Sequence, residues 1–482
     1  MNKLLDKKTL RKFLIINGEN VETESYSPLY SPYSGELIAE IAMGDEAATK
    51  KAIAAAFEAK KVIGNMPAYE RAEILENVVR ILKERTDEIA EIISTEAAKP
   101  IVFAKAEVAR TVETYKFAAE EAKRIHGETL PFDAASGGVG RIGYTLREPL
   151  GVIGAITPFN FPLNLVAHKL GPAIAAGNTV VLKPASQTPL SSLFIAEVFA
   201  EAGLPAGVLN VVTGPGGVVG EALIEDERVN MITFTGSPSV GIGIRNKAGL
   251  KKTTLELGSN SALIIDKDVE ISEIIDRCTM GAFSNQGQVC ISLQRVYVHE
   301  DLYEEFTGKF VEATKKLKLG DPLDPETYIS SLISKKELER TLSWIEETKQ
   351  SEAVVLTGGK ARDNILEPTI IANADHCLKV SCQEVFAPIV IVNKVKSVEE
   401  AIDYVNDSRF GLQAGIYTNN VKNALYATKN LHVGGVIVND IPTFRVDHMP
   451  YGGVKESGTG REGIKYAIEE MTEMKLVVWN QG

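Results

Sequence analysis

Short apolar runs alternate with segments of helical periodicity between residues 151 and 257. The apolar runs lie at 151–156, 179–182, 209–212, 231–234 and 253–257, and the predicted helices lie near 163–176, 190–202, 217–225 and 238–248. Strands that alternate with helices favour a parallel sheet with right-handed crossovers and helices on both faces. A second run of this kind spans about 260–440. The expected fold class is therefore α/β, with two open sheets facing a cleft.

Length and charge narrow the possible partners. The chain has 482 residues, more than one hydrophobic core usually serves, so two or three domains are expected. The net charge of -12 at pH 7 argues against a nucleic-acid or anionic membrane surface. The expected partners are a small molecule and a second copy of the chain. The six histidines show no metal-ligand spacing, so no metal is predicted.

Cysteine usage and the N-terminus bear on the compartment. The chain has four cysteines, without a Cys-x-x-Cys pair, which is typical of a reducing compartment. Residues 1–8 are charged where a signal peptide needs an apolar core. We therefore expect a cytoplasmic protein.

The ends of the chain suggest an oligomer. Helices are expected at 45–63, 68–99 and 102–125, after an irregular N-terminal arm. Residues 139–146 alternate like an exposed hairpin, and residues 475–480 form another short strand. Edge strands of this kind have unpaired backbone N–H and C=O groups, so both could extend sheets in a neighbouring subunit. A homodimer or homotetramer is expected.

A single thiol, Cys290, follows the polar, glycine-bearing stretch 284–289. Most intracellular cysteines are buried structural residues, so the thiol alone is weak evidence for a nucleophile. Other polar residues strengthen the interpretation of Cys290 as a nucleophile. Asn160 follows one apolar run, and Glu256 lies within another. Either could instead be structural, as a turn residue or a surface carboxylate, although the leucines flanking Glu256 disfavour simple exposure.

Several polar loops follow the predicted strands, where ligands of open parallel sheets bind. They contain Thr157 to Asn160, Lys183 to Ser186, and Gly236 with Ser237. The glycine patterns at 214–220 and 236–241 do not match the dinucleotide fingerprint G-x-G-x-x-G. Each pattern taken alone is more typical of a structural turn than of a phosphate cradle.

Four motifs occur together in a specific order: Phe234-Thr-Gly-Ser237, Glu256-Leu-Gly258, Gly287-Gln-Val-Cys290 and Glu384-Val-Phe386. With them, the chain resembles the aldehyde dehydrogenase superfamily over essentially its whole length. The resemblance implies a nicotinamide-dinucleotide-binding domain at 1–125 and 146–254, with part of 455–468. It also implies a catalytic domain at 255–445 and a β-hairpin oligomerisation element at 126–145 and 469–482.

The resemblance also implies roles for matching residues. Cys290 would be the nucleophile, Glu256 the general base and Asn160 the oxyanion donor. The chemistry requires these types, because an aldehyde cannot surrender hydride until a nucleophile makes its carbonyl carbon tetrahedral. The implied cofactor contacts are Thr157, Pro158, Phe159, Lys183, Ser186, Gly236, Ser237, Leu257, Glu384 and Phe386.

Ser186 bears on which cofactor can be accepted, since many NAD-specific members of the family carry Glu at this position. A carboxylate would accept the ribose 2′-hydroxyl but repel a 2′-phosphate, whereas Ser186 beside Lys183 leaves an uncharged donor and a cation. NADP is therefore the expected cofactor, and NAD is also possible.

The stretch from 438 to 453 resembles the branch that contains non-phosphorylating glyceraldehyde-3-phosphate, lactaldehyde and phosphonoacetaldehyde dehydrogenases. Arg445, with Arg110, could clamp an anionic group remote from the aldehyde. Val289 stands where some phosphate-specific members have Arg, which favours a smaller or less charged aldehyde. The alternative for Arg445 is an ion pair with Asp447 or another local carboxylate.

The expected function is NAD(P)-dependent oxidation of a short, hydroxylated or anionic aldehyde to its acid, through a cysteine thiohemiacetal and thioester. The expected substrate is of the glyceraldehyde-3-phosphate, lactaldehyde or sulfolactaldehyde type. A CoA-acylating semialdehyde dehydrogenase would share Cys290 but pass the thioester to CoA. A cofactor-independent thiol hydrolase would need a histidine base beside the thiol. A non-enzymatic binding protein would tolerate the loss of Cys290.

Overall fold

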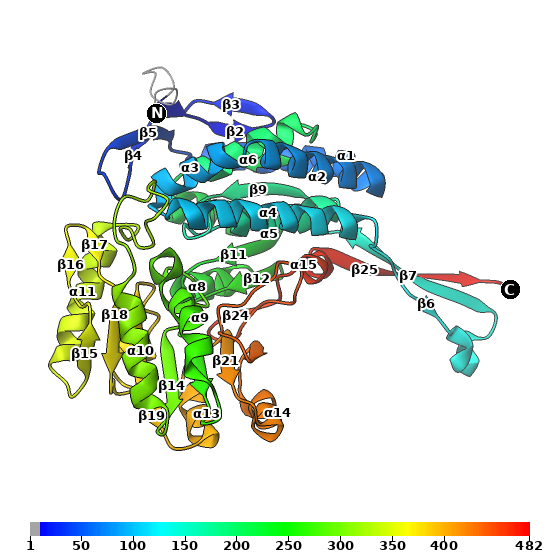
Figure 1. Cartoon of the computed structure of the whole chain (residues 1–482). Coiled ribbons are helices and arrows are strands. Elements are labelled where there is room, and N and C mark those ends of the chain that lie inside the picture. The colour runs from blue at the N-terminus through cyan, green and yellow to red at the C-terminus, as the bar shows by residue number, and fades with distance from the viewer. Residues whose placement is uncertain (1–9) are drawn as a thin grey trace.

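The computed structural model describes residues 10–482, which form two large sheets covered by helices and one projecting arm (Figure 1). Residues 1–8, on which the expectation about a signal peptide rested, lie outside the described residues. Within 10–482, no helix combines the length and the apolar character needed to cross a bilayer. The α/β fold class predicted from the alternating pattern is confirmed.

The first large sheet has a parallel centre, as the apolar runs predict. Its strands in spatial order are β24 (Gly458–Thr459), β12 (Lys252–Glu256), β11 (Val229–Thr235), β8 (Val152–Ile156), β9 (Thr179–Lys183), β10 (Leu209–Val211), β2 (Leu14–Ile16) and β3 (Glu19–Val21). The strands from β12 to β10 are parallel, and both margins are antiparallel.

Strand order reverses in the middle of this sheet. In the chain, β8 is the first of the parallel strands, yet it lies between β11 and β9. The connections from β8 therefore run to β9 and β10 on one side and return to β11 and β12 on the other. This reversal is a topological switch point, where open α/β sheets bind their ligands. Asn160 follows β8 closely, and Gly236 follows β11 directly.

Helices cover both faces of the first sheet. One face packs against α2 (Ala68–Glu84), α3 (Thr86–Ala97), α4 (Ile101–Ala122), α5 (Asn164–Ala175), α6 (Leu190–Glu201) and α15 (Ile464–Glu470). The other packs against α1 (Glu46–Asn65), α7 (Glu221–Glu225) and α8 (Pro238–Lys247). A turn of π-helix (Gly216–Gly220) precedes α7, in the segment predicted as one helix.

The prediction of one helix over 68–99 is wrong, because the chain breaks between α2 and α3. Arg85 has φ −109° and ψ 22°, outside helical values. The Thr86 hydroxyl donates to the Leu82 carbonyl at 3.0 Å. A threonine hydroxyl that bonds a carbonyl four residues back tends to bend a helix, which fits the position of the break.

The second large sheet is parallel except for one edge strand. Its spatial order is β15 (Val354–Thr357), β18 (Thr369–Ala372), β19 (Ile389–Val395), β14 (Arg295–His299), β13 (Ala262–Ile265), β21 (Gln413–Tyr417) and β22 (Gly435–Val438). Its helices are α9 (Ile271–Phe283), α10 (Tyr303–Lys315), α11 (Lys335–Lys349), α12 (Lys379–Cys382), α13 (Val398–Asn406) and α14 (Val421–Asn430). Apolar clusters lie on both faces.

The N-terminal segment is more regular than predicted. Instead of an irregular arm, it forms a small sheet of β1 (Arg11–Lys12), β5 (Leu37–Ala42) and β4 (Tyr26–Tyr30), while β2 and β3 extend the first large sheet. These strands are short, which weakens their period-2 signal in the sequence. Two further strand pairs are β16 (Ala361–Arg362) with β17 (Ile365–Leu366), and β20 (Phe410–Gly411) with β23 (Val454–Lys455).

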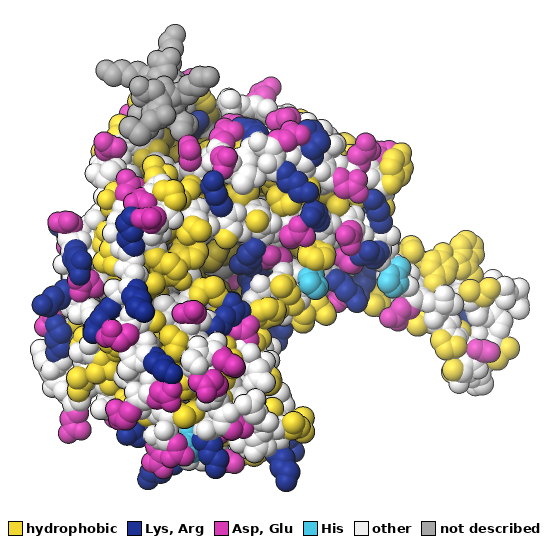
Figure 2. Space-filling model, in the orientation of Figure 1, with side chains coloured by type: hydrophobic (Ala, Val, Ile, Leu, Met, Phe, Trp, Pro, Cys, Tyr) yellow, Lys and Arg dark blue, Asp and Glu magenta, His cyan; other side chains and the backbone are white. Residues whose placement is uncertain are grey.

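The arm brings together segments far apart in the sequence. In it, β7 (Arg141–Pro149) lies between β6 (Thr129–Leu130) and β25 (Thr472–Asn480). The antiparallel register of β25 and β7 runs unbroken from Thr472 opposite Pro149 to Asn480 opposite Arg141. Figures 1 and 2 show this arm standing away from the body of the molecule.

Candidate active site

The loop that carries Cys290 begins in left-handed backbone. Asn285, Gln286 and Gly287 have φ values of 50°, 54° and 67°. A Cβ at Gly287 would stand 2.2 Å from the Ala387 carbonyl oxygen, so only glycine fits there. Left-handed backbone at two non-glycine residues costs about 1–3 kcal/mol each, and it persists only where surrounding contacts enforce it.

Buried side-chain amides provide those contacts. The Asn285 amide nitrogen donates to the Asn160 carbonyl at 3.2 Å. The Gln286 amide nitrogen donates to the carbonyls of Ala98 at 2.9 Å and Ser331 at 3.0 Å. The loop is thereby attached to the segment after β8, to the end of α3 and to the segment before α11. These attachments fix the position of the thiol relative to both large sheets.

Cys290 is half-buried, and its sulfur lies 2.9 Å from the Tyr451 hydroxyl. Burial raises the pKa of the Cys290 thiol to about 11, while the hydrogen bond from Tyr451 and the charge of Arg445 act to lower it. The thiol therefore needs local stabilisation to become a thiolate. The apolar side chains around it are Val289, Ile291, Leu412 and Tyr451, with Phe161 and Met449 beside them.

Asn160, the predicted oxyanion donor, lies next to the thiol loop. Its amide nitrogen donates to the Gln288 carbonyl at 2.9 Å, two residues before the thiol. An amide group carries two hydrogens, so one remains for a substrate oxygen. Within the described part of the chain, the Cys290 backbone N–H makes no hydrogen bond either. Two donors are therefore available near the sulfur.

Glu256 ends β12 and is buried. Among residues 10–482, neither of its carboxyl oxygens has a hydrogen-bond partner. Burial, followed by the charge of Glu462, raises the pKa of Glu256 well above its usual 4.5. A buried carboxyl without partners carries a desolvation cost, so it is a candidate for a functional role.

Glycine brings this carboxyl toward the thiol. A Cβ at Gly452 would stand 3.0 Å from a Glu256 carboxyl oxygen, so the carboxyl rests against the backbone of Gly452. The preceding residue is Tyr451, whose hydroxyl contacts Cys290. The negative charge of Glu256 acts to raise the pKa of both Cys290 and Tyr451. The structure therefore brings the thiol, the Asn160 amide and the Glu256 carboxyl into one region.

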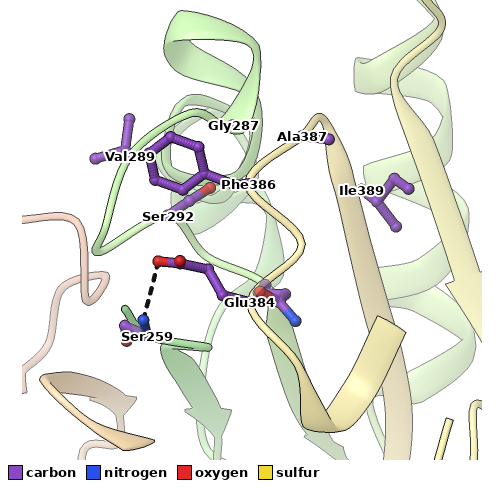
Figure 3. Close-up of a pocket in the computed structure, with 9 residues that line it drawn as sticks. Ser259, Gly287, Val289, Ser292, Glu384, Phe386, Ala387 and Ile389 are labelled. Carbon is purple, nitrogen blue, oxygen red and sulfur yellow. Dashed lines mark hydrogen bonds between the residues drawn. The ribbon is translucent and has the colours of Figure 1, made fainter. Parts of the chain in front are cut away.

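A cavity beside this site contains Glu384, which accepts a hydrogen bond from the Ser259 backbone N–H at 3.0 Å (Figure 3). Burial raises the pKa of Glu384 to about 7. The Phe386 ring faces the same cavity, 5.7 Å from the Phe159 ring in an edge-to-face contact. A Cβ at Gly258 would stand 2.9 Å from Glu384. A carboxyl acceptor beside two aromatic rings suits a ligand that has ribose hydroxyls and a flat ring.

A second cavity lies near the end of β9. Ser186 lines it, with Thr213 and Gly214 opposite, and its hydroxyl is 3.5 Å from the Gly214 carbonyl. Lys183 is buried, which lowers the pKa of its ammonium group to about 8. Its Nζ donates to the Pro184 carbonyl at 2.9 Å. This cavity holds a hydroxyl donor, with a cation at the end of β9 itself.

The remaining predicted cofactor residues lie at the strand ends of the first sheet. Ser237 precedes α8, and Gly236 donates its N–H to the Glu256 carbonyl at 3.0 Å. The Thr157 N–H donates to the Lys183 carbonyl at 3.2 Å, and Pro158 follows it. A helix N-terminus attracts anions, so α8 suits a phosphate group. Leu257 is buried at the end of β12.

Both predicted arginines are paired with carboxylates. Arg110 makes two hydrogen bonds to Asp447, at 2.7 and 3.2 Å. Arg445 donates to Glu462 at 3.0 Å, so its carboxylate partner is Glu462 and not Asp447. His168 joins the two pairs, since its Nε2 lies 2.8 Å from Asp447 and 3.2 Å from Arg445. The two arginines are thus brought to one buried network.

Comparisons with known proteins agree with this geometry. A family model described as the aldehyde dehydrogenase family matches residues 20–477. The chain belongs to the aldehyde dehydrogenase family. It is 48% identical to a 3-sulfolactaldehyde dehydrogenase of Priestia aryabhattai, over 97% of this chain and 98% of the relative. It is 43% identical to a lactaldehyde dehydrogenase of Methanococcus aeolicus, over 97% of this chain and 100% of the relative.

Solved structures of the aldehyde dehydrogenase family also match the chain. A glyceraldehyde-3-phosphate dehydrogenase of Methanocaldococcus jannaschii, complexed with NADP, matches with a TM-score of 0.91 and 40% identity. The match covers 95% of this chain and 100% of the solved chain. As a member of the aldehyde dehydrogenase family, this chain is an oxidoreductase. The alternative of a non-enzymatic binding protein is therefore excluded.

Sequence reasoning assigned no role to several residues of this aldehyde dehydrogenase. The Lys169 ammonium donates to Glu462 at 3.2 Å, and Asn164 donates to Asp447 at 3.1 Å. Tyr451 contacts the sulfur itself. No local sequence pattern identifies these contacts, because the two partners of each lie far apart along the chain. The one available signal was a lysine, a histidine and an asparagine within an otherwise apolar predicted helix, which implies buried partners.

Proposed function

We propose that this enzyme oxidises a short, hydroxylated or anionic aldehyde to its carboxylic acid, using Cys290, Asn160 and Glu256. The observation that carries the proposal is the convergence of these three groups beside the cavity of Glu384 and Phe386. The hydrogen-bond partner of Cys290 is Tyr451 and not a histidine, which disfavours a thiol hydrolase with a histidine base.

The reaction begins when the Cys290 thiolate attacks the aldehyde carbon. A carbon–sulfur bond forms, and the carbonyl π electrons move to oxygen as a thiohemiacetal oxyanion. The free amide hydrogen of Asn160 and the Cys290 N–H are positioned to stabilise that charge. Each such donor is worth about 10²–10³ in turnover. Collapse of the oxyanion expels hydride and leaves a thioester on Cys290.

Glu256 then acts on water. An ionised Glu256 takes a proton from a water molecule as that water attacks the thioester carbon. The carbon–sulfur bond breaks, the acid leaves and Cys290 is restored as a thiolate. Burial raises the pKa of Glu256, so its carboxylate is a stronger base toward water than an exposed one would be.

The hydride acceptor in this proposal is NADP, with NAD as an alternative. When bound, the nicotinamide cofactor would supply the acceptor for the hydride. Glu384 and Phe386 would hold its nicotinamide ribose, with Phe159 against Phe386. Gly236 and Ser237 would approach the pyrophosphate, and the adenosine ribose would lie at Lys183 and Ser186. The solved relative complexed with NADP supports this choice, as does the absence of a carboxylate at position 186.

The domain division follows the two sheets. We assign the dinucleotide-binding domain to 1–125 and 146–254, with part of 455–468, and the catalytic domain to 255–445. The first large sheet and its switch point lie mostly in the former, and the second large sheet lies in the latter. Residues of both domains would therefore hold the cofactor, with Lys183, Ser186, Gly236 and Ser237 from the first and Glu384 and Phe386 from the second.

Arg445 is the proposed anchor for an anionic group on the substrate. Its side chain is only 6% exposed and lies near Cys290, whose pKa its charge lowers. Among residues 10–482, its Nε has no hydrogen-bond partner. A buried guanidinium N–H without a partner favours an acceptor supplied by the substrate. The sulfonate or phosphate of substrates named for the relatives would supply one.

An aldehyde panel tests this function. We expect oxidation without CoA, higher kcat/KM for sulfolactaldehyde or glyceraldehyde 3-phosphate than for lactaldehyde, and activity with NADP and NAD. Arg445→Gln is expected to raise KM for the anionic aldehydes about 10- to 100-fold, since a hydrogen bond to an anion is lost. The effect on lactaldehyde should be smaller. Steady-state kinetics on both substrates measure the difference.

The control for this prediction is Arg80→Gln, which removes an exposed arginine of α2 paired with Glu84. It should leave every KM unchanged. If Arg445→Gln raised KM by the same factor for anionic and neutral aldehydes, the proposed role of Arg445 as an anion anchor would be refuted. A strict requirement for CoA would instead establish the acylating alternative.

The arm is the proposed oligomerisation element, residues 126–145 and 469–482. One long edge of β25 is unpaired in the described chain. Hydrophobic side chains gather on the arm (Figure 2), and those that are exposed are Val139, Ile142, Leu146, Met474, Leu476, Val478 and Trp479. A long apolar edge strand invites pairing with another chain. A second copy is the proposed partner, in a dimer or tetramer.

The double substitution Leu476→Lys with Val478→Lys is expected to lower the oligomeric mass. Both side chains are exposed on one face of β25, and lysines oppose edge-to-edge association. Light scattering after size-exclusion chromatography measures the mass. Leu250→Lys, at a fully exposed site outside the arm, should change nothing. A monomeric wild type, or an unchanged mass in the double variant, would contradict the assignment.

A further inference from the structure

Tyr451 touches the reacting sulfur, although the chemistry above uses only the thiol, amide and carboxyl. Its hydroxyl lies 2.9 Å from the Cys290 sulfur. The side chain is 3% exposed and belongs to the apolar cluster that surrounds the thiol. In a cluster of this kind the hydroxyl is the polar exception, and a buried phenol normally has a defined partner. Here that partner is the proposed nucleophile.

A chain of charged contacts holds this ring in place. The Arg445 guanidinium stands 3.7 Å from the ring centroid of Tyr451. Glu462 fixes Arg445 at 3.0 Å and also accepts from Lys169 at 3.2 Å. Cation–π contacts strengthen when they are desolvated, as this one is. The ring therefore has little freedom to turn its hydroxyl away from the sulfur.

The direction of the hydrogen bond follows from the protonation of the two groups. Burial, with the neighbouring Cys290, raises the pKa of Tyr451 well above 10, so the phenol keeps its proton at neutral pH. A neutral thiol can donate or accept in this contact. A thiolate can only accept, and its bond with the phenol is then charge-assisted and stronger. The contact thus favours the thiolate over the thiol.

We propose that Tyr451 is a further catalytic residue, whose hydroxyl donates a hydrogen bond to the Cys290 sulfur, favours its thiolate form and holds it for attack. The proton that leaves the thiol passes to solvent, and the phenol keeps its own. Arg445, anchored by Glu462, is a positioning residue that holds the ring. The other charged groups that affect the sulfur are Glu256 and Glu384, and both oppose the thiolate.

Alkylation of the resting enzyme by iodoacetamide tests this proposal. Tyr451→Phe keeps the ring and removes the hydroxyl. Losing a hydrogen bond to an anion lowers the thiolate population about 10- to 100-fold. The greater nucleophilicity of a more basic thiolate returns roughly half of that on a logarithmic scale. We therefore expect alkylation of Cys290 about three- to tenfold slower at each pH from about 6.5 to 8.5.

Mass spectrometry of the peptide containing Cys290 separates this signal from the other three thiols. The matched control is Tyr115→Phe, because the Tyr115 hydroxyl is buried without a partner within 10–482. That variant should alkylate at the wild-type rate. Thermal unfolding of both variants shows that the fold is kept. A Tyr451→Phe rate profile that coincides with the wild type would overturn the proposal, as would a faster one.

The proposal rests on the proposed role of Cys290, and this assay separates the two. It uses neither aldehyde nor cofactor. A normal profile in Tyr451→Phe, together with aldehyde oxidation by the wild type, would refute the role of Tyr451 alone. A slowed profile without any aldehyde oxidation would leave the contact between Tyr451 and Cys290 intact and refute the proposed function.

Discussion

Cys290→Ala is expected to lower aldehyde oxidation by at least about 10⁴-fold and to remove the rapid burst of hydride transfer. An aldehyde carbon bears its hydrogen on a trigonal centre, and hydride leaves only after a nucleophile has made that centre tetrahedral. The loop with φ values of 50° and 54° at Asn285 and Gln286 holds one thiol in the position to do this. No other side chain at the site is a comparable nucleophile at neutral pH.

Cofactor affinity should be unchanged in Cys290→Ala, because the residues assigned to the cofactor lie on other loops. Stopped-flow absorbance of the reduced cofactor measures the burst, and calorimetry measures cofactor binding. The matched controls are Cys377→Ala, at an exposed thiol, and Cys278→Ala, at a thiol in the core of the second sheet. Both should retain the burst. An undiminished burst in Cys290→Ala would refute the assigned nucleophile.

The sheets were predictable because buried parallel strands are continuously apolar. The predicted runs at 179–182 and 209–212 correspond to β9 (Thr179–Lys183) and β10 (Leu209–Val211). Predictions failed where local signals were short or ambiguous. The strands before residue 43 are two to six residues long, and the helix break at Arg85 coincides with a threonine hydroxyl that bonds back to Leu82.

The residues proposed to carry the chemistry were identified for a different reason. Cys290, Asn160 and Glu256 stand in motifs whose order and spacing resemble a family, whereas their meeting in space depends on two sheets and a switch point. Their local supports could not be predicted. The carboxylate of Asp447 accepts from Arg110, 337 positions earlier in the chain, and no local pattern encodes such a contact.

The network around Arg445 shows what such contacts add. From sequence, Arg445 has two readings, a substrate anchor or half of an ion pair. In the structure Glu462 is its carboxylate partner, and within residues 10–482 its Nε has no hydrogen-bond partner. The ion pair with Glu462 therefore leaves room for the proposed substrate contact at another atom of the same guanidinium. A planar group with five donors can do this, and a lysine at the same position could not.

Glu256→Gln is expected to slow steady-state acid release about 10²–10⁴-fold, the range typical of a lost general base, while sparing most of the hydride burst. Gln has the same shape as Glu, so the cavity beside Gly452 stays filled. It cannot take a proton from water, so the thioester on Cys290 should accumulate. Rapid mixing with acid quench would detect one acyl group per site.

The pH dependence of this step has a defined sign. The pKa of Glu256 is raised well above 4.5, so the carboxyl stays protonated at pH values where an exposed one is ionised. Acid release by the wild type should therefore increase as pH rises through that elevated pKa. The increase should vanish in Glu256→Gln, whose residual rate should depend on pH only through the thiol and hydroxide.

Asp266→Asn is the control, because it neutralises a buried carboxylate at the far end of β13 from the thiol loop. It should leave both the burst and the turnover unchanged. If Glu256→Gln instead abolished the burst together with turnover, the carboxyl would be needed before hydride leaves. Its role would then be to take the proton of Cys290. Separate measurement of the burst and the steady state distinguishes these roles, because a base for the thiol acts before hydride transfer and a base for water acts after it.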